Sequence, residues 1–192
     1  MSRDGVGDVR ALVVDDEKEV ADAYALRLQG HCEVEAVYTG RAALSAVAES
    51  TVDVVLLDRH MPDMSGDEVL AELDERAFEG RVVMVTAVDP GFDVLEMPFD
   101  DYLCKPVDRE DLRAAVDHQR TVLAYETLGD YFSAASKLAV LERETSAERR
   151  RDHDGYARVV RRAATLERRA RRLLGDDADL IDEFERIGRE GL

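Results

Sequence analysis

Short apolar runs alternate with segments of helical periodicity over residues 9–120, and this alternation restricts the fold more than any other feature of the chain. The runs LVV, VVLL and VVMV are apolar on both faces of an extended strand. Strands of this kind belong to parallel sheets that helices cover on both sides. We therefore expect an α/β fold with strands at residues 11–16, 32–38, 52–58, 81–87 and 100–106, and helices at residues 18–29, 41–49, 66–78 and after Asp108.

Four of these five expected strands end in groups that can do chemistry. In open parallel sheets, ligands bind beyond the carboxyl ends of the strands, so these groups are expected in one crevice. The central segment VVLLDRHMPDMSG, residues 54–66, delivers a carboxylate to that edge and then turns at Pro62 and Gly66. The groups at the strand ends are Asp15 and Asp16, Asp58, Thr86 and Lys105.

Three carboxylates at one edge repel each other unless a cation joins them. Oxygen ligands with positions left for water suit Mg²⁺, which would also neutralise an incoming phosphoryl group. Asp58 is then the natural nucleophile and would form an acyl phosphate. Lys105 and Thr86 would complete the contacts to the phosphoryl oxygens.

The motifs DD (15–16), LLDRHMPDMSG (56–66), VTA (85–87) and YLCKP (102–106) together resemble the receiver domain of two-component response regulators. The resemblance covers residues 9 to about 120, with the motifs in the order and spacing of the family. It implies a flavodoxin-like (CheY-like), doubly wound, five-stranded parallel sheet in the order 2-1-3-4-5.

The resemblance also implies roles for individual residues. Asp58 matches the phosphoacceptor, which receives a phosphoryl group from a sensor histidine kinase. Asp16 matches the direct Mg²⁺ ligand, Asp15 acts largely through water, and the backbone carbonyl of His60 matches the third protein ligand. The remaining matches are Thr86 and Lys105 to the phosphoryl contacts, Thr86 and Tyr102 to the switch pair, and Lys105-Pro106 to a cis peptide bond.

Simpler interpretations exist for each residue taken alone. Asp16 could cap the first helix, Thr86 could be an ordinary strand residue, and Tyr102 could be a packed aromatic. Lys105 alone would be a solvated charge, and the His60 side chain is expected to point to solvent. Only the complete set argues against coincidence.

One segment departs from the family pattern. Residues 87–101, AVDPGFDVLEMPFDD, contain three positions that disfavour a regular helix, Pro90, Gly91 and Pro98, and no basic residue. We expect the fourth helix to be short or irregular. The usual dimer geometry of the family, which uses this region, is therefore not assumed.

The charge is strongly acidic and unevenly spread. The formal net charge is −17, and only three of the 26 basic residues are Lys. Residues 1–120 hold 28 acids and 12 bases, whereas residues 121–192 hold 15 acids and 14 bases. The excess of acids suits a protein kept in solution at very high salt or an ordinary acidic protein, and it argues against nucleic-acid binding by the first region.

We expect the protein to be soluble and cytoplasmic, because two kinds of apolar segment are missing from the sequence. No apolar run is long enough to span a bilayer, and MSRDGVGDVR lacks the apolar core of a signal peptide. Cys32 and Cys104 would lie on opposite edge strands, about 19 Å apart. A disulfide requires Cα atoms within about 7 Å, so both should be free thiols.

Residues 121–192 follow a helical pattern throughout. One long helix is expected to leave the receiver, with Gly129 as a break or bend, and RDHDG (151–155) to form a loop. A helix with apolar residues from Tyr156 to Leu174 on one face follows. Residues 175–179 interrupt the pattern, and a short amphipathic helix with Leu180, Ile181, Phe184 and Ile187 comes last.

This helical region resembles the HalX-type domain that follows receivers in haloarchaeal regulators. The segments that carry the resemblance are DYFSAASKLAVLE (130–142) and the Arg-rich helix after it. The resemblance supplies no defined output. Long amphipathic helices tend to pair between chains, so we expect an all-α hairpin or coiled coil and a homodimer through residues 110–174.

The Arg-rich helix has a basic face. Residues 149–172 contain ten Arg and three acids. The face could pair with acids of neighbouring helices such as Asp179, Asp182 and Glu185, dock on the acidic receiver or a partner protein, or contact nucleic acid. Because high salt weakens phosphate binding most, the first two interpretations are favoured.

Three classes of function therefore remain. The leading hypothesis is a phosphorylation-controlled signalling switch with no enzymatic activity beyond its own Mg²⁺-dependent phosphorylation and dephosphorylation, and with an unknown downstream protein. The first alternative is a DNA-binding transcriptional regulator that uses the Arg-rich helix. The second is an aspartyl-nucleophile phosphohydrolase, which is disfavoured because His60 stands where such enzymes have a second Asp.

Overall fold

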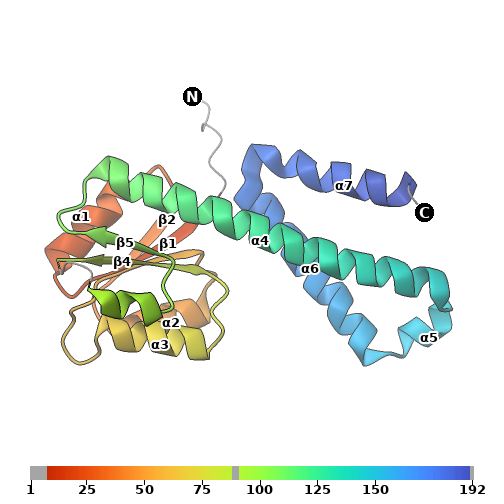
Figure 1. Ribbon diagram of the computed structural model, residues 1–192, viewed down its shortest axis with the longest axis horizontal. Helices are drawn as coiled ribbons and strands as arrows, with labels where there is room; N and C mark the ends of the chain where they lie inside the picture. Colours follow the sequence, from red (N-terminus) through yellow and green to blue (C-terminus); the bar gives the residue numbers. More distant parts are fainter. Residues whose placement is uncertain (1–7, 88–90, 191–192) are drawn as a thin grey trace. The chain divides into compact units, whose positions relative to one another are not determined.

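The computed structural model of the chain describes residues 8–87 and 91–190 (Figure 1). It contains two compact units, one formed by Asp8–Arg120 and the other by the chain from Thr121 onward. Residues 1–7, on which the expectation about a signal peptide rests, lie outside the described residues, as do residues 88–90, which include Pro90 of the short-helix prediction.

The first unit is built on a parallel sheet with the predicted strand order, β2-β1-β3-β4-β5 (Figure 1). The pairing is parallel at every step of the sheet. The strands are β1 (Arg10–Val14), β2 (Glu33–Val37), β3 (Val54–Leu57), β4 (Arg81–Thr86) and β5 (Asp101–Cys104).

Burial explains why the apolar runs form the centre of this sheet. All four residues of β3 are buried, as are five of the six in β4, whereas the edge strand β2 is partly exposed. Helices α2 (Gly40–Glu49) and α3 (Gly66–Glu75) cover one face, and α1 (Lys18–Leu28) and the first part of α4 (Arg109–Glu144) cover the other (Figure 1). The fold class predicted from the alternation is therefore confirmed.

Side-chain caps set where helices α3 and α4 begin, after the loops at the carboxyl edge of the sheet. Ser65 caps α3 through a reciprocal pair of bonds with Glu68, in which the Ser65 hydroxyl accepts from the Glu68 amide and the Glu68 carboxylate accepts from the Ser65 amide. Asp108 accepts from the amides of Glu110 and Asp111 at 2.8 and 2.9 Å, which starts α4 where the sequence indicated.

The fourth helix of the alternation is short, as expected. It is a 3₁₀ helix, η1 (Phe92–Glu96), followed by extended backbone at Met97. Pro98 directly after Met97 favours this extended geometry.

The second unit consists of helices. The later part of α4 is followed by α5 (Ala147–Arg151), α6 (Asp154–Leu174), the 3₁₀ turn η2 (Gly175–Ala178) and α7 (Asp179–Glu190). Helix α6 runs back along α4, because Tyr156 bonds to Glu142 and Arg162 bonds to Asp130.

Two details of the helical prediction were wrong. Helix α4 continues unbroken through Gly129. The expected loop at residues 151–155 is mostly helical, since Arg151 ends α5 and Asp154 begins α6. The expected last helix is present as α7, with Ile181 buried and Leu180 41% exposed, and the side chains of Phe184 and Ile187 lie outside the described residues.

The physical reason for the extra helix is a tertiary contact. Ser146 accepts from the Arg149 amide and caps α5. The Arg150 guanidinium then donates to the backbone carbonyls of Leu141, Glu142 and Thr145, which are acceptors at and just beyond the end of α4. Helix α5 thus positions Arg150, whose guanidinium binds carbonyl groups at the C-terminal end of α4.

Cys32 and Cys104 are both free thiols, as predicted. No helix in the part of the chain that the structure describes is both long and apolar enough to cross a membrane.

Candidate functional site

Asp58 lies directly after β3, where the parallel register carries it past the edge of the sheet. Its amide donates to the carbonyl of Val14 at 2.8 Å, which continues the pairing of β3 with β1 by one residue. The residue is 5% exposed. Asp58 is therefore the first residue after the four buried apolar residues of β3, at the carboxyl end of the strand.

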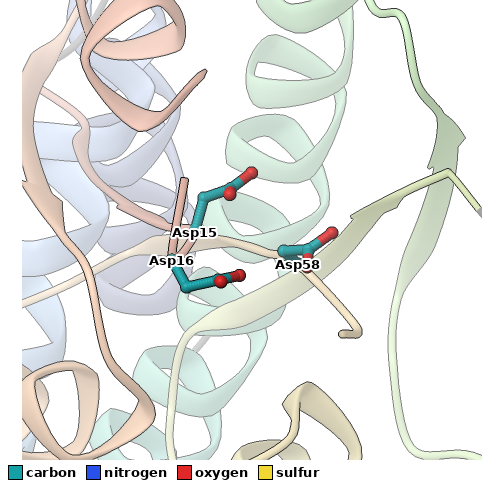
Figure 2. Close-up of side chains that lie close together, drawn as sticks. All are labelled: Asp15, Asp16 and Asp58. Carbon is teal, nitrogen blue, oxygen red and sulfur yellow. The ribbon is translucent and has the colours of Figure 1, made fainter. Parts of the chain in front are cut away.

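Asp15 and Asp16 follow β1 in the same way. The Asp15 amide donates to the Val37 carbonyl at 3.2 Å, and the Asp15 carboxylate accepts from the Glu17 amide at 3.0 Å. Each of Asp15, Asp16 and Asp58 offers one carboxylate oxygen, and these oxygens lie within 4.8 Å of one another. Figure 2 shows the three side chains directed into the same space.

Lys105 binds two of these carboxylates. Its Nζ lies 2.6 Å from Asp15 Oδ2 and 2.9 Å from Asp58 Oδ1. The backbone of Lys105 extends the sheet, since its amide donates to the Thr86 carbonyl at 2.8 Å, and the bond to Pro106 is cis. The fifth strand therefore brings a cation to the acids of the first and third.

The electrostatics of the cluster follow from this burial. Burial raises the pKa of the Asp58 carboxyl, and this effect together with the charge of Asp15 outweighs the lowering by Lys105 and by the His60 amide. Burial alone would lower the pKa of Lys105, but its hydrogen bonds to Asp15 and Asp58 and their charges raise the pKa overall. Lys105 is therefore a protonated ammonium at neutral pH.

The three carboxylates fit a hard divalent cation. Oxygen atoms this close, with two of the three residues buried, are the donor set that Mg²⁺ takes from proteins. One ammonium faces them, so the cluster keeps an excess of negative charge that a cation would neutralise. The structure does not give Asp16 the simpler capping role, because the N-cap of α1 is Glu17 and no side chain caps the helix.

The loop after Asp58 holds the carboxylate in place. The His60 amide donates to Asp58 Oδ2 at 3.0 Å, while the His60 side chain is exposed, as expected. The Gly66 amide donates to the Arg59 carbonyl at 2.9 Å and closes the loop. A Cβ on Gly66 would lie 2.2 Å from the carbonyl oxygen of Asp58, so only glycine fits there.

Arg59 is a positioning residue that sequence reasoning missed. Its guanidinium binds Asp67 in two places, with Nε 3.1 Å from Oδ1 and Nη2 3.2 Å from Oδ2, and this pair ties the loop to the start of α3. The signal was present in the sequence as a basic residue beside the nucleophile candidate and an acid in the first turn of the next helix.

The expected switch residues lie on neighbouring strands. Thr86 ends β4 and is 1% exposed, and Tyr102 in β5 is partly buried. Tyr102 packs against the hydrophobic core and against the Phe99 ring, with centroids 5.7 Å apart. The register pairs Met84 with Tyr102, so the aromatic lies two residues before the position of Thr86 on the adjacent strand.

The basic face of α6 is partly paired within the chain. Arg162 lies 3.3 Å from Asp130, and Arg171 bridges Glu167 at 2.9 Å and Asp182 at 2.7 Å. Of the three acids proposed as partners, Asp182 has this role, while the side chain of Glu185 lies outside the described residues. Four arginines of the face, Arg158, Arg161, Arg162 and Arg168, are exposed.

Two family models match the chain. The response regulator receiver domain matches residues 11–117, which is more than half of the chain. The HalX domain matches residues 121–187.

The curated relatives agree with these models. A putative transcriptional regulator of Haloferax volcanii is 44% identical over 133 residues, which cover 68% of this chain and 23% of the relative. The transcriptional regulatory protein CutR of Streptomyces coelicolor is 41% identical over 112 residues, which cover 56% of this chain and 52% of CutR. The chain thus matches a quarter to a half of the length of these relatives.

Solved structures resemble the first unit. The signal receiver domain of a putative Luxo repressor protein from Vibrio parahaemolyticus is 26% identical, with a TM-score of 0.60 over 63% of this chain and 96% of that one. The response regulator DrrB from Thermotoga maritima is 33% identical, with a TM-score of 0.52 over 57% of this chain and 51% of that one.

Proposed function

Because the chain belongs to the response regulator receiver family and carries a HalX domain after the receiver, we propose that it is a phosphorylation-controlled switch. In this proposal Asp58 accepts a phosphoryl group from a sensor histidine kinase in the cytoplasm, and the helical unit relays the signal to a downstream protein.

One observation carries the proposal. A buried carboxylate at the end of a central strand lies among two further carboxylates and an ammonium, with Nζ of Lys105 2.9 Å from Asp58 Oδ1. A structural ion pair would need one acid for one base. Three acids with one base form a site that is incomplete until further positive charge arrives.

The proposed reaction is a single phosphoryl transfer, and three side chains of the chain take part in it. A carboxylate oxygen of Asp58 attacks the phosphorus of the donor, the bond from phosphorus to the donor's nitrogen or oxygen breaks, and an acyl phosphate results. The Lys105 ammonium already forms an ion pair with Asp58 and can donate to a phosphoryl oxygen. Its positive charge would then stabilise the negative charge on the phosphoryl oxygens. The Thr86 hydroxyl, at the end of the adjacent strand, would bind a second phosphoryl oxygen.

Asp15, Asp16, Asp58 and the backbone carbonyl of His60 would hold the divalent cation, with Asp15 acting largely through water. When bound, Mg²⁺ would neutralise the charge of the phosphoryl oxygens and of the acidic cluster. Asp58 would thus be both a ligand and the nucleophile.

The test is phosphorylation by a small donor. Acetyl phosphate with Mg²⁺ should add one phosphoryl group to the full chain, as seen by intact mass. Asp58→Ala should abolish the addition. Asp63→Asn is the matched control, because Asp63 lies in the same loop at φ 67°, a conformation that Asn adopts readily, and should leave labelling unchanged. Persistent labelling of Asp58→Ala would refute the assignment.

The metal assignment has its own variant. Asp16→Ala should reduce labelling with Mg²⁺ to the level seen with a chelator. It should leave the folded state intact, because Asp16 does not cap α1. A variant that keeps the full response to Mg²⁺ would exclude Asp16 as a ligand.

A second candidate function, DNA binding, is favoured by one feature, the four exposed arginines on α6. The Haloferax and Streptomyces relatives are named as transcriptional regulators, over parts of their length. Under the leading proposal, neither the wild type nor Arg161→Glu with Arg168→Glu binds duplex DNA. Binding by the wild type with a steep salt slope, lost in the variant, would make the DNA-binding function the better one.

A further inference from the structure

Helix α4 has two apolar faces beyond Arg120, and only one of them is buried. The buried face carries Leu123, Thr127, Tyr131 and Ala134. The opposite face carries a second stripe with steps of three and four residues, which we call the outer stripe: Val122, Tyr125, Gly129, Phe132, Ser136 and Val140.

The outer stripe is only partly covered in the single chain, since Val122 and Phe132 are half-buried and the other four members are exposed. Tyr125 is 56% exposed and Val140 is 51% exposed. At about 100° per residue, every member lies within about 60° of Gly129, on the side opposite the buried face. A helix with one neighbour needs one apolar stripe, so a second stripe indicates a second neighbour.

Gly129 gives an independent indication of close approach. It lies in the middle of a continuous helix, where glycine is less favourable than alanine. An added Cβ would meet nothing within 4 Å among the described residues of its own chain, so none of their contacts requires a glycine there. Two helix backbones that approach closely do require small residues at the crossing point, and Gly129 and Ser136 lie on the same stripe.

We propose that the outer stripe of α4 is the interface for the α4 of a second copy of this chain, packed antiparallel. A two-fold axis near residues 132 and 133 pairs Tyr125 with the second copy's Val140, and Gly129 with the second copy's Ser136. Phe132 then packs beside Ser133 of the other helix. Each contact thus occurs twice about the axis, because in an isologous interface residue i contacts residue j and j contacts i.

The charges beside the stripe favour a second copy in this orientation. Glu126 and Lys137 lie on the same flank of the outer stripe, one in each half. A two-fold axis perpendicular to antiparallel helices brings like flanks together, so Glu126 of each copy lies near Lys137 of the other. A parallel pair would place opposite flanks together and lose both contacts.

This dimer does not depend on the phosphoryl chemistry, because every residue involved lies in the helical unit. The unphosphorylated full chain is therefore the material for the test. Sedimentation over a concentration series in high salt should show a dimer. Tyr125→Asp should raise the dimer Kd by about tenfold or more, as removal of an aromatic anchor from an interface centre does.

Two further variants separate the interface from folding. Val160→Asp introduces the same charge at an apolar position that is 40% exposed on α6, and it should leave the dimer unchanged. Gly129→Leu should keep the helix content and still lose the dimer, because the side chain fills only the space that the second copy needs. A monomer at every concentration, or a dimer that Gly129→Leu leaves intact, would overturn the proposal.

Cross-linking tests the orientation. In a Cys32→Ser, Cys104→Ser background, Ser133→Cys should form a disulfide between copies, and Val140→Cys should not. Two copies of residue 140 would be separated by about 22 Å along an antiparallel pair, at 1.5 Å per residue. Tyr125→Cys mixed with Val140→Cys should form the heterologous link. Self-linking of Val140→Cys as fast as Ser133→Cys would show a parallel pair and refute the inference.

Discussion

Replacing Gly66 with alanine should damage the receiver through the backbone of Asp58, the proposed phosphoacceptor. The new Cβ would lie 2.2 Å from the Asp58 carbonyl oxygen and 2.8 Å from the Arg59 Cα. Both atoms belong to the backbone, so no side-chain rotation relieves the overlap. The loop between Asp58 and α3 must open by roughly 1 Å for ordinary van der Waals contact to be restored.

The size of the effect follows from the geometry. Overpacking of this kind costs about 1–3 kcal/mol. Alanine recovers up to about 1 kcal/mol because it is a better helix residue than glycine. The net loss of one or two kcal/mol should lower the Tm of the receiver by roughly 4–8 °C. A displacement of Asp58 near 1 Å should slow phosphorylation by about 10²-fold.

The assay is calorimetry of the full chain together with the rate of labelling by acetyl phosphate. Gly129→Ala, measured in a Tyr125→Asp background that removes the proposed dimer, is the matched control, since the same added methyl group meets nothing within 4 Å among the described residues of its own chain and should stabilise the helix by about 0.5–1 kcal/mol. Opposite signs for the two substitutions would support the proposed geometry. Gly66→Ala that melts and labels like the wild type would refute it.

Three other predictions follow from single contacts. Iodoacetamide at pH 8 should label the exposed Cys104 and leave Cys32 unreacted until the chain unfolds, because burial, with the charge of Asp117, raises the pKa of Cys32 to about 11; equal labelling in the folded state, read by peptide mass, would contradict this. Arg150→Ala should destabilise the helical unit by about 1–3 kcal/mol by removing charged donors from three carbonyls, with Arg151→Ala as a neutral control in the same urea titration. Lys105→Met should destabilise the chelator-treated receiver by about 1–3 kcal/mol, because it leaves two buried carboxylates without their ammonium; an unchanged urea midpoint would show that the pair contributes nothing.

The sheet could be predicted from the sequence because its signal is local and strong. The four residues of β3 are apolar and buried, and Asp58 follows directly after them, at the carboxyl end of the strand. The gathering of Asp15, Asp16, Asp58 and Lys105 at one edge of the sheet could be predicted too, since parallel strands end at one edge whatever their order. The short fourth helix could be predicted as well, because proline has no backbone N–H to donate and its ring clashes with the preceding turn of a helix.

The helical unit was predicted less well because its details rest on tertiary contacts. Helix α5, sequence AERRR, has no apolar stripe, and it depends on the Ser146 cap and on Arg150 reaching the carbonyls of the last turns of α4. Gly129 suggested a break from local propensity alone. The packing of Leu128 and Tyr131 on either side of it holds the helix through that position.

The ion pairs around the site could not be predicted from the sequence either. Nothing in the spacing shows that Lys105 binds both Asp15 and Asp58, or that Arg59 binds Asp67, because these contacts join residues from different elements. Sequence reasoning places residues at an edge of the sheet, and side-chain geometry decides which of them touch.

The most direct test of the central claim is to find the residue that carries the phosphoryl group. The full chain is treated with acetyl phosphate and Mg²⁺, the acyl phosphate is reduced with borohydride, and the modified residue is located by peptide mass spectrometry. We predict modification at Asp58 alone, lost when a chelator replaces Mg²⁺. Modification at Asp15, Asp16 or another residue, or an unmodified chain in the presence of Mg²⁺, would contradict the assignment of Asp58 as the phosphoacceptor.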